Sequence, residues 1–201
     1  LQREAVTQLD ERLAQLGRLL SKPTFGDLLD GVLQARAALG SALDEPPRVE
    51  SLLAVDARAE ALLCAADTLT GALEQAGATP SLGIINLAGR QRMLSQRLAK
   101  EALFAALLPE PAAGLAREAA ARTAGEVDEA LATLRAAPLA GTELQSALAD
   151  ALADWPVVRA AAARAGSDDG RRHLALASEQ VLERFERLTE QVERGMQRLL
   201  G

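Results

Sequence analysis

The residues of this chain best suited to chemistry are the cations of one short segment. Residues 84–100 (IINLAGRQRMLSQRLAK) contain Arg90, Arg92, Arg97 and Lys100 and no acidic side chain, although the whole chain has a net charge of −6. A guanidinium group offers parallel N–H donors that match planar and tetrahedral oxyanions. An anion is therefore the kind of partner that these residue types could bind.

Other reactive side chains are scarce. The chain has one Cys, Cys64, one His, His173, and no Tyr. A single Cys excludes an internal disulfide and Cys-rich metal sites, and a single His excludes Glu-x-x-His di-iron sites, zincins and most catalytic triads. We therefore expect no enzyme activity, no metal and no cofactor. Cys64 is expected to be buried and His173 exposed, whereas Trp155 and Phe185 are expected to anchor a core.

The composition favours helices along the whole chain. Ala and Leu fill 43 and 37 of the 201 positions, whereas Val and Ile together fill only 11. Strong helix formers in long segments predict an all-α fold, an antiparallel long-helix bundle of the four-helix type. Pro and Gly mark the breaks, and Pro156 predicts a kink or break near Trp155. Seven helical segments are expected, at about 2–20, 24–43, 46–77, 81–107, 112–137, from 142 onward, and 167–200.

Charge and hydropathy exclude two classes of partner. The acidic balance and the small number of aromatic residues, three Phe and one Trp, argue against nucleic-acid binding. No stretch of 18 apolar residues occurs without a charge, so we expect no membrane span in this chain.

A weak internal repeat organises the segments. Residues 59–74 align with residues 178–193 at a constant offset of 119, and residues 28–39 align with residues 144–155 at an offset of 116. The repeat predicts a tandem of two related bundles, of which residues 1–79 form an incomplete first copy and residues 80–201 a complete four-helix domain. The opening helix of the first copy would then precede Leu1. The first alignment pairs Glu60 with Glu179, Leu63 with Leu182, Leu69 with Leu188, Thr70 with Thr189 and Glu74 with Glu193.

Arg92 differs from the other cations in its place on the helix. At about 100° per residue it lies about 160° from Arg90 and about 140° from Arg97, at the border of the packing face or within it. A buried cation costs several kcal/mol unless it is paired, so this position requires an anionic partner. From periodicity alone, a carboxylate of another helix, such as Glu143 or Glu179, and a bound anion remain equally open.

The neighbours of Arg92 leave room for a compact anion. Ala88, Gly89 and Ser95 are small, and the Ser95 hydroxyl could contribute to binding. The other cations, Arg90, Arg97 and Lys100, are expected to form a solvated or salt-bridged surface of the same helix.

The segment IINLAGRQRMLSQRLAK resembles the signature of the PilJ-type domain, the extracytoplasmic input module of type IV pili methyl-accepting chemotaxis transducers. It is also similar to the P-box of the NarX/NarQ nitrate-sensing kinases. The Gly-x-x-Arg-Met of these kinases falls on Gly89, Arg92 and Met93. Where the kinases have Ser-Leu this chain has Arg90-Gln91, and where they have Tyr it has Gln96, as in the chemoreceptor branch.

The resemblance implies a sensor. It implies a periplasmic or extracytoplasmic bundle that pairs with another copy and binds nitrate or nitrite between motif helices, with Arg92 as the anion-binding arginine. The pairing would be a homodimer or, if the repeat is real, an association of the two copies within one chain. The signalling partner is not indicated. The alternative is a helical scaffold for protein association that binds no small ligand.

Overall fold

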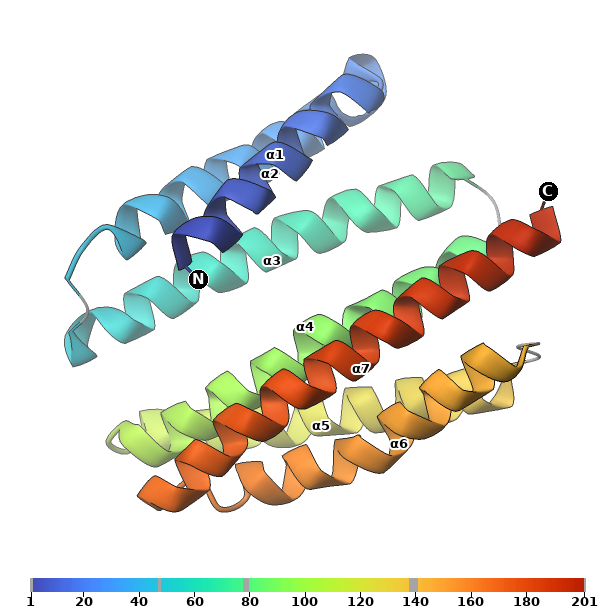
Figure 1. Cartoon of the computed structure of the whole chain (residues 1–201). Helices are drawn as coiled ribbons and strands as arrows, with labels where there is room; N and C mark the ends of the chain where they lie inside the picture. Colours follow the sequence, from blue (N-terminus) through green and yellow to red (C-terminus); the bar gives the residue numbers. More distant parts are fainter. Residues whose placement is uncertain (1, 47, 78–79, 138–140, 201) are drawn as a thin grey trace. The chain divides into compact units, whose positions relative to one another are not determined.

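The chain is almost entirely helical. The computed structural model describes residues 2–46, 48–77, 80–137 and 141–200, and these residues contain no strand. The all-α prediction is confirmed. The helices of the described residues (Figure 1) are α1 (Gln2–Leu19), α2 (Lys22–Leu43), α3 (Val49–Gly77), α4 (Pro80–Leu107), α5 (Ala112–Ala136), α6 (Thr142–Ala162) and α7 (Asp168–Leu200).

Proline and glycine mark most helix ends, as expected, with three differences. Helix α3 begins at Val49, three residues after the expected start at Pro46. Helix α2 begins at Lys22 with Ser21 as its N-cap, two residues before the expected start at Thr24. The sequence predicted a kink or a break at Pro156; helix α6 continues through this residue to Ala162, so the break does not occur. The side chains of Trp155 and Val158, on either side of this proline, are both buried in the core, and their packing offsets the lost backbone hydrogen bond.

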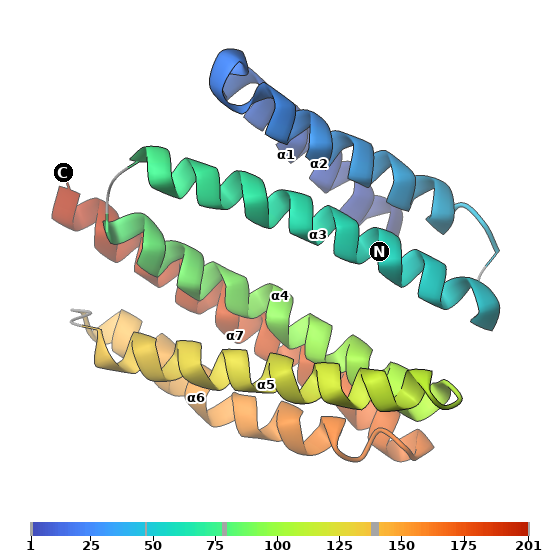
Figure 2. The same cartoon turned by 180° about the vertical axis from the view of Figure 1, so that it is seen from behind.

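The chain divides into two compact units, Leu1–Ala78 (unit 1) and Thr79–Gly201 (unit 2). Unit 2 is an antiparallel four-helix bundle, in which α4 packs mainly against α5 and α7, and α6 packs mainly against α7. Figure 2 shows the same bundle from behind, with the chain reversing direction at each connection. Helix α4, which carries the cationic segment, therefore has two extensive neighbours, α5 and α7.

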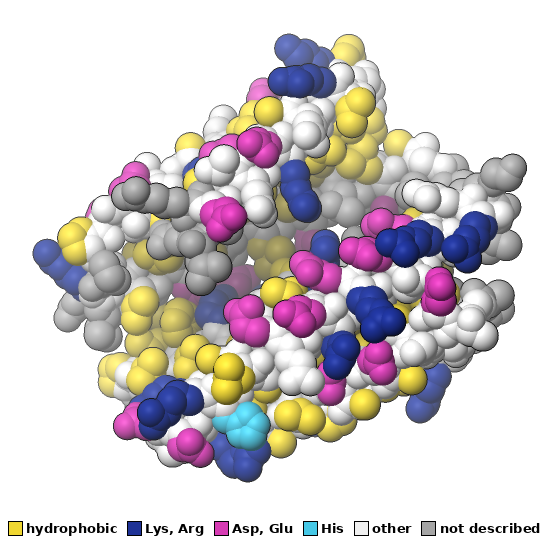
Figure 3. Space-filling view, viewed as in Figure 1, with side chains coloured by type: hydrophobic (Ala, Val, Ile, Leu, Met, Phe, Trp, Pro, Cys, Tyr) yellow, Lys and Arg dark blue, Asp and Glu magenta, His cyan; other side chains and the backbone are white. Residues whose placement is uncertain are grey.

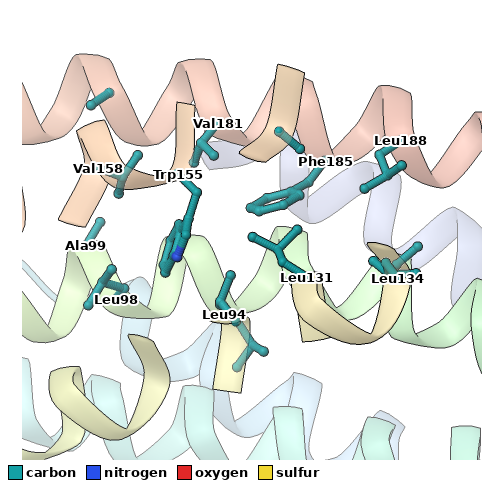
Figure 4. Close-up of a cluster of buried hydrophobic side chains, with 14 of the residues drawn as sticks. Leu94, Leu98, Ala99, Leu131, Leu134, Trp155, Val158, Val181, Phe185 and Leu188 are labelled. Carbon is teal, nitrogen blue, oxygen red and sulfur yellow. The ribbon is translucent and has the colours of Figure 1, made fainter. Parts of the chain in front are cut away.

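The core of unit 2 draws side chains from all four helices. Figure 4 shows Leu94 of α4, Leu131 of α5, Trp155 of α6 and Phe185 of α7 converging on one cluster. The rings of Trp155 and Phe185 lie 6.4 Å apart at an interplanar angle of 53°, a geometry that aromatic pairs favour. Both residues are buried, as expected. The opposite face of α7 is charged, and Figure 3 shows acidic and basic side chains side by side along it.

Unit 1 has a much smaller core. Helix α2 packs along α3, whereas α1 has few contacts with α2. The fully buried apolar residues of this unit, among those described, are Leu13, Val32 and Leu69.

Cys64 lies on α3 and is exposed, so the prediction that it is buried is wrong. At about 100° per residue it points about 140° away from Leu69, and therefore away from the core of unit 1.

None of the described helices is both long enough and apolar enough to cross a lipid bilayer.

Candidate functional site

The cationic segment lies in the middle of α4, where the helix presents a buried stripe to the bundle. Ala88, Gln91, Ser95 and Leu98 recur at intervals of three or four residues, and all four are buried. This spacing is that of one face of an α-helix. The stripe contains two polar residues, Gln91 and Ser95, and no cation.

Arg92 lies beside this stripe and is half-buried. Its Nε donates a hydrogen bond to the Gly89 carbonyl oxygen at 3.4 Å, which is long for such a bond. Among the described residues the structure gives Arg92 no carboxylate partner, and both Glu143 and Glu179 are exposed. The guanidinium group is thus at the border of the packing face, with most of its donors uncommitted to protein acceptors.

The other residues expected to contact the ligand surround Arg92 unevenly. Ser95 is buried, but its hydroxyl donates to the Arg92 carbonyl oxygen at 2.9 Å and is therefore already used within α4. Ala88 is fully buried, and Met93 packs against the hydrophobic core. Gly89 faces α7, because a Cβ atom there would meet Thr189 Cγ2 at 3.7 Å.

The remaining cations of the segment have partners. Arg90 lies 3.8 Å from a carboxylate oxygen of Glu126, and Arg97 Nε donates to Glu101 Oε1 at 3.0 Å. Lys100 is half-buried and is also partnered. Within the described part of the chain, the structure gives Arg92 a backbone acceptor and no acidic one.

Sequence reasoning missed two buried polar residues of α4. The Glu101 carboxylate accepts hydrogen bonds from Arg97 and, at 2.8 Å, from the Thr123 hydroxyl, so it joins α4 to α5. Gln91 donates through Nε2 to the Leu87 carbonyl oxygen at 2.7 Å, while its Oε1 is buried without a partner among the described residues. The signal for Gln91 was its register, because it lies three residues after Ala88 and seven before Leu98.

Helix α4 is also fixed to α7 by a polar contact. Gln96 Nε2 donates to the Ser178 carbonyl oxygen at 2.9 Å. This hydrogen bond lies one helical turn from Arg92.

The described residues contain no group of three or more His, Cys, Asp or Glu side chains that could hold a metal ion.

Comparison with known families gives a match over residues 76–181, just over half of the chain. The matching family is PilJ, the N-terminal region of type IV pili methyl-accepting chemotaxis transducers. The chain belongs to this family. The match includes the whole cationic segment, α5 and α6. No curated protein and no solved structure matches the chain.

Membership of the PilJ family makes unit 2 a signalling domain of the chemotaxis-transducer type, in a family that is not catalytic. The match starts at residue 76, so most of unit 1 lies outside it. The relation to the NarX/NarQ kinases and the internal repeat both stay predictions.

Proposed function

We propose that unit 2 is an extracytoplasmic input domain that binds a small inorganic oxyanion, nitrate or nitrite, through Arg92. The observation that carries this proposal is the state of Arg92, which is half-buried in the PilJ motif helix and bonded to a carbonyl oxygen rather than to a carboxylate. An external anion would stabilise a guanidinium group in such a place more than a carbonyl oxygen does. The reason is that hydrogen bonds between two charged groups are stronger than those to a neutral acceptor.

The binding site forms between two motif helices. Arg92 lies at the border of the packing face, so a second motif helix across a near-two-fold axis brings a second guanidinium close to it. Two cations repel each other when the site is empty, and one oxyanion between them replaces this repulsion with hydrogen bonds from both sides. The second helix comes from another copy of the chain or from a repeat within it.

The signal is a small displacement of helices. The ligand favours the paired arrangement only to the extent that it binds that arrangement more tightly than the unpaired one. The hydrogen bond from Gln96 to the Ser178 carbonyl oxygen couples α4 to α7, so a shift of the motif helix moves the helix that leads to the end of the chain.

Isothermal titration calorimetry with sodium nitrate and sodium nitrite, against sodium chloride as reference, tests the proposal. The unaltered chain is expected to bind at least one of these oxyanions and not chloride. Arg92→Ala is expected to lose binding, because Arg90 and Arg97 already have acidic partners and Lys100 is also partnered. Arg90→Ala is the matched control, since Arg90 is exposed and already lies near Glu126.

Three results would contradict the assignment of Arg92: nitrate binding unchanged in Arg92→Ala, equal loss in both variants, or no binding of either anion by the unaltered chain. The extracytoplasmic location has its own test. Osmotic-shock fractionation of cells that make the native protein is expected to place this domain outside the cytoplasm.

A second candidate function is a scaffold for protein association without a small ligand. The Ser95 hydroxyl favours it, because its hydrogen bond within α4 leaves one polar group fewer for a ligand. A chain that binds neither oxyanion but self-associates unchanged when Arg92 is replaced would support the scaffold.

A further inference from the structure

Unit 2 contains a cavity of about 430 Å³ between α4, α5 and α6. It lies toward the end of the bundle where α4 ends and α5 begins. None of the residues expected to contact the oxyanion lines it, and the nearest part of the cationic segment is Leu98. Its size falls within the range of about 300–1,000 Å³ that is typical of small-molecule sites.

Polar contacts through Asp128 join α5 to α6 beside the cavity. Asp128 of α5 accepts hydrogen bonds from Trp155 Nε1 at 2.7 Å and from Arg159 Nη1 at 2.8 Å, both on α6. Beyond this point the facing side chains are methyl groups, such as those of Ala102, Ala124 and Ala162. Short methyl groups leave part of the space between these helices unfilled.

The charged side chains that line this cavity are both basic. Its charged lining residues are Arg117 of α5 and Arg159 of α6, and the side chains of both are more than half exposed. Each uses a terminal nitrogen to pair with a carboxylate, Arg117 with Glu110 and Arg159 with Asp128. A guanidinium group has five N–H donors, so both arginines keep donors for a further acceptor.

We propose that this cavity binds a monocarboxylate with an aliphatic body of medium length. The hydrocarbon chain occupies the alanine-lined volume, where removal of apolar surface from water favours binding. The carboxylate lies at the rim and accepts hydrogen bonds from Arg117 and Arg159, for which a planar carboxylate is a good geometric match. An inorganic oxyanion does not suit this cavity, because it would leave the apolar walls unfilled.

Sodium octanoate is the probe, and Trp155 is the reporter because it is the only Trp of the chain. Trp155 and Arg159 share Asp128, so an octanoate carboxylate that engages Arg159 alters the hydrogen bonding of the indole. The unaltered chain is expected to show a saturable change in Trp155 fluorescence and a matching heat of binding by calorimetry.

Two kinds of variant test the site: one fills part of the cavity volume, and the other removes a positive charge at its rim. Ala121 lines the cavity and is exposed, so Ala121→Leu fills part of the volume without disturbing the core and is expected to weaken octanoate binding at least tenfold. Ala132→Leu is the matched control, an exposed alanine of the same helix outside the cavity, and its affinity is expected to stay within about twofold. Arg117→Gln and Arg159→Gln are each expected to weaken binding about five- to tenfold, which corresponds to the net loss of one hydrogen bond at a solvent-exposed rim.

Three results would overturn the proposal, provided that circular dichroism shows each variant to be folded: octanol bound as tightly as octanoate, octanoate affinity unchanged in Ala121→Leu, or no binding by the unaltered chain. Arg92→Ala is expected to bind octanoate with unchanged affinity, so the proposed oxyanion site and the proposed octanoate site are tested separately. Loss of octanoate binding in Arg92→Ala would also count against a separate site.

Discussion

Units 1 and 2 are built from the same kind of helix but enclose very different cores. In unit 2 each of the four helices contributes buried side chains to one continuous cluster that includes Trp155, Phe185 and Leu188. In unit 1 the buried apolar residues of the described chain are Leu13, Val32 and Leu69. The comparison shows that long Ala/Leu-rich helices become a well-enclosed domain only when helices cover the core on every side.

The largest expected effect is at Phe185, which is fully buried against Trp155. Phe185→Ala is expected to lower the free energy of unfolding of unit 2 by about 3–5 kcal/mol, because it removes a large apolar side chain and leaves a cavity. Urea denaturation followed by Trp155 fluorescence measures this. Leu176→Ala, at a position that is 72% exposed, is the control and should change stability by less than about 0.5 kcal/mol.

The next prediction compares the two units directly through two residues that the repeat aligns. Leu69 and Leu188 are both buried, each in the core of its own unit. Leu188→Ala is expected to lower the free energy of unfolding of unit 2 by about 2–5 kcal/mol. Leu69→Ala is expected to lower that of unit 1 by less than about 2 kcal/mol, because the residues of a small, partly covered core can move in to fill the space that the side chain leaves. Hydrogen exchange resolved to peptides of each unit gives both values. Equal costs would show that the two cores are equally well enclosed.

A smaller effect is expected at Glu101, the buried carboxylate that joins α4 to α5. Glu101→Ala leaves the buried Thr123 hydroxyl without its acceptor and removes a partner of Arg97, at a cost of about 1–3 kcal/mol. Glu101→Gln keeps an acceptor for Thr123 and should lie between this variant and the unaltered chain. If Glu101→Ala unfolds at the same urea concentration as the unaltered chain, the link contributes nothing to the bundle.

The smallest change in stability is expected at Gln91, and unlike the preceding substitutions it is expected to stabilise the bundle or leave it unchanged. Its Oε1 atom is buried without a partner in the described structure, so Gln91→Leu removes an unsatisfied acceptor at similar volume. The variant is expected to be as stable as the unaltered chain or more stable by about 1 kcal/mol, seen as a melting temperature raised by a few degrees. A clear loss of stability would mean that Oε1 holds an ordered water in solution.

Much of the fold could be predicted from the sequence, because Pro and Gly mark the helix ends. At Pro156 the sequence predicted a kink or a break. The break does not occur, because Trp155 and Val158 bury their side chains on either side of the proline and this packing keeps α6 continuous. The burial of Cys64 could not be predicted correctly from composition, since Ala and Leu occur on every side of α3 and periodicity is weak there.

The candidate site could be predicted only in part. The sequence singled out Arg92, but adjacent positions on a helix differ by only about 100°, and α4 packs against both α5 and α7, which widens its buried arc. Periodicity could not decide that Gln91 occupies the centre of this arc and Arg92 its border. The hydrogen bond between Thr123 and Glu101 could not be predicted from the sequence either, because it depends on the register of α5 against α4.

The most direct test of the central claim, that Arg92 binds an oxyanion, is to follow the Nε–H resonances of the arginine side chains by NMR during a nitrate titration. Arg92 Nε now donates to a carbonyl oxygen at 3.4 Å, so a bound anion should shift its signal strongly and saturably, while the signal of exposed Arg90 should hardly move. A nitrate titration in which the Arg92 signal does not move, or moves no more than that of Arg90, would contradict the account.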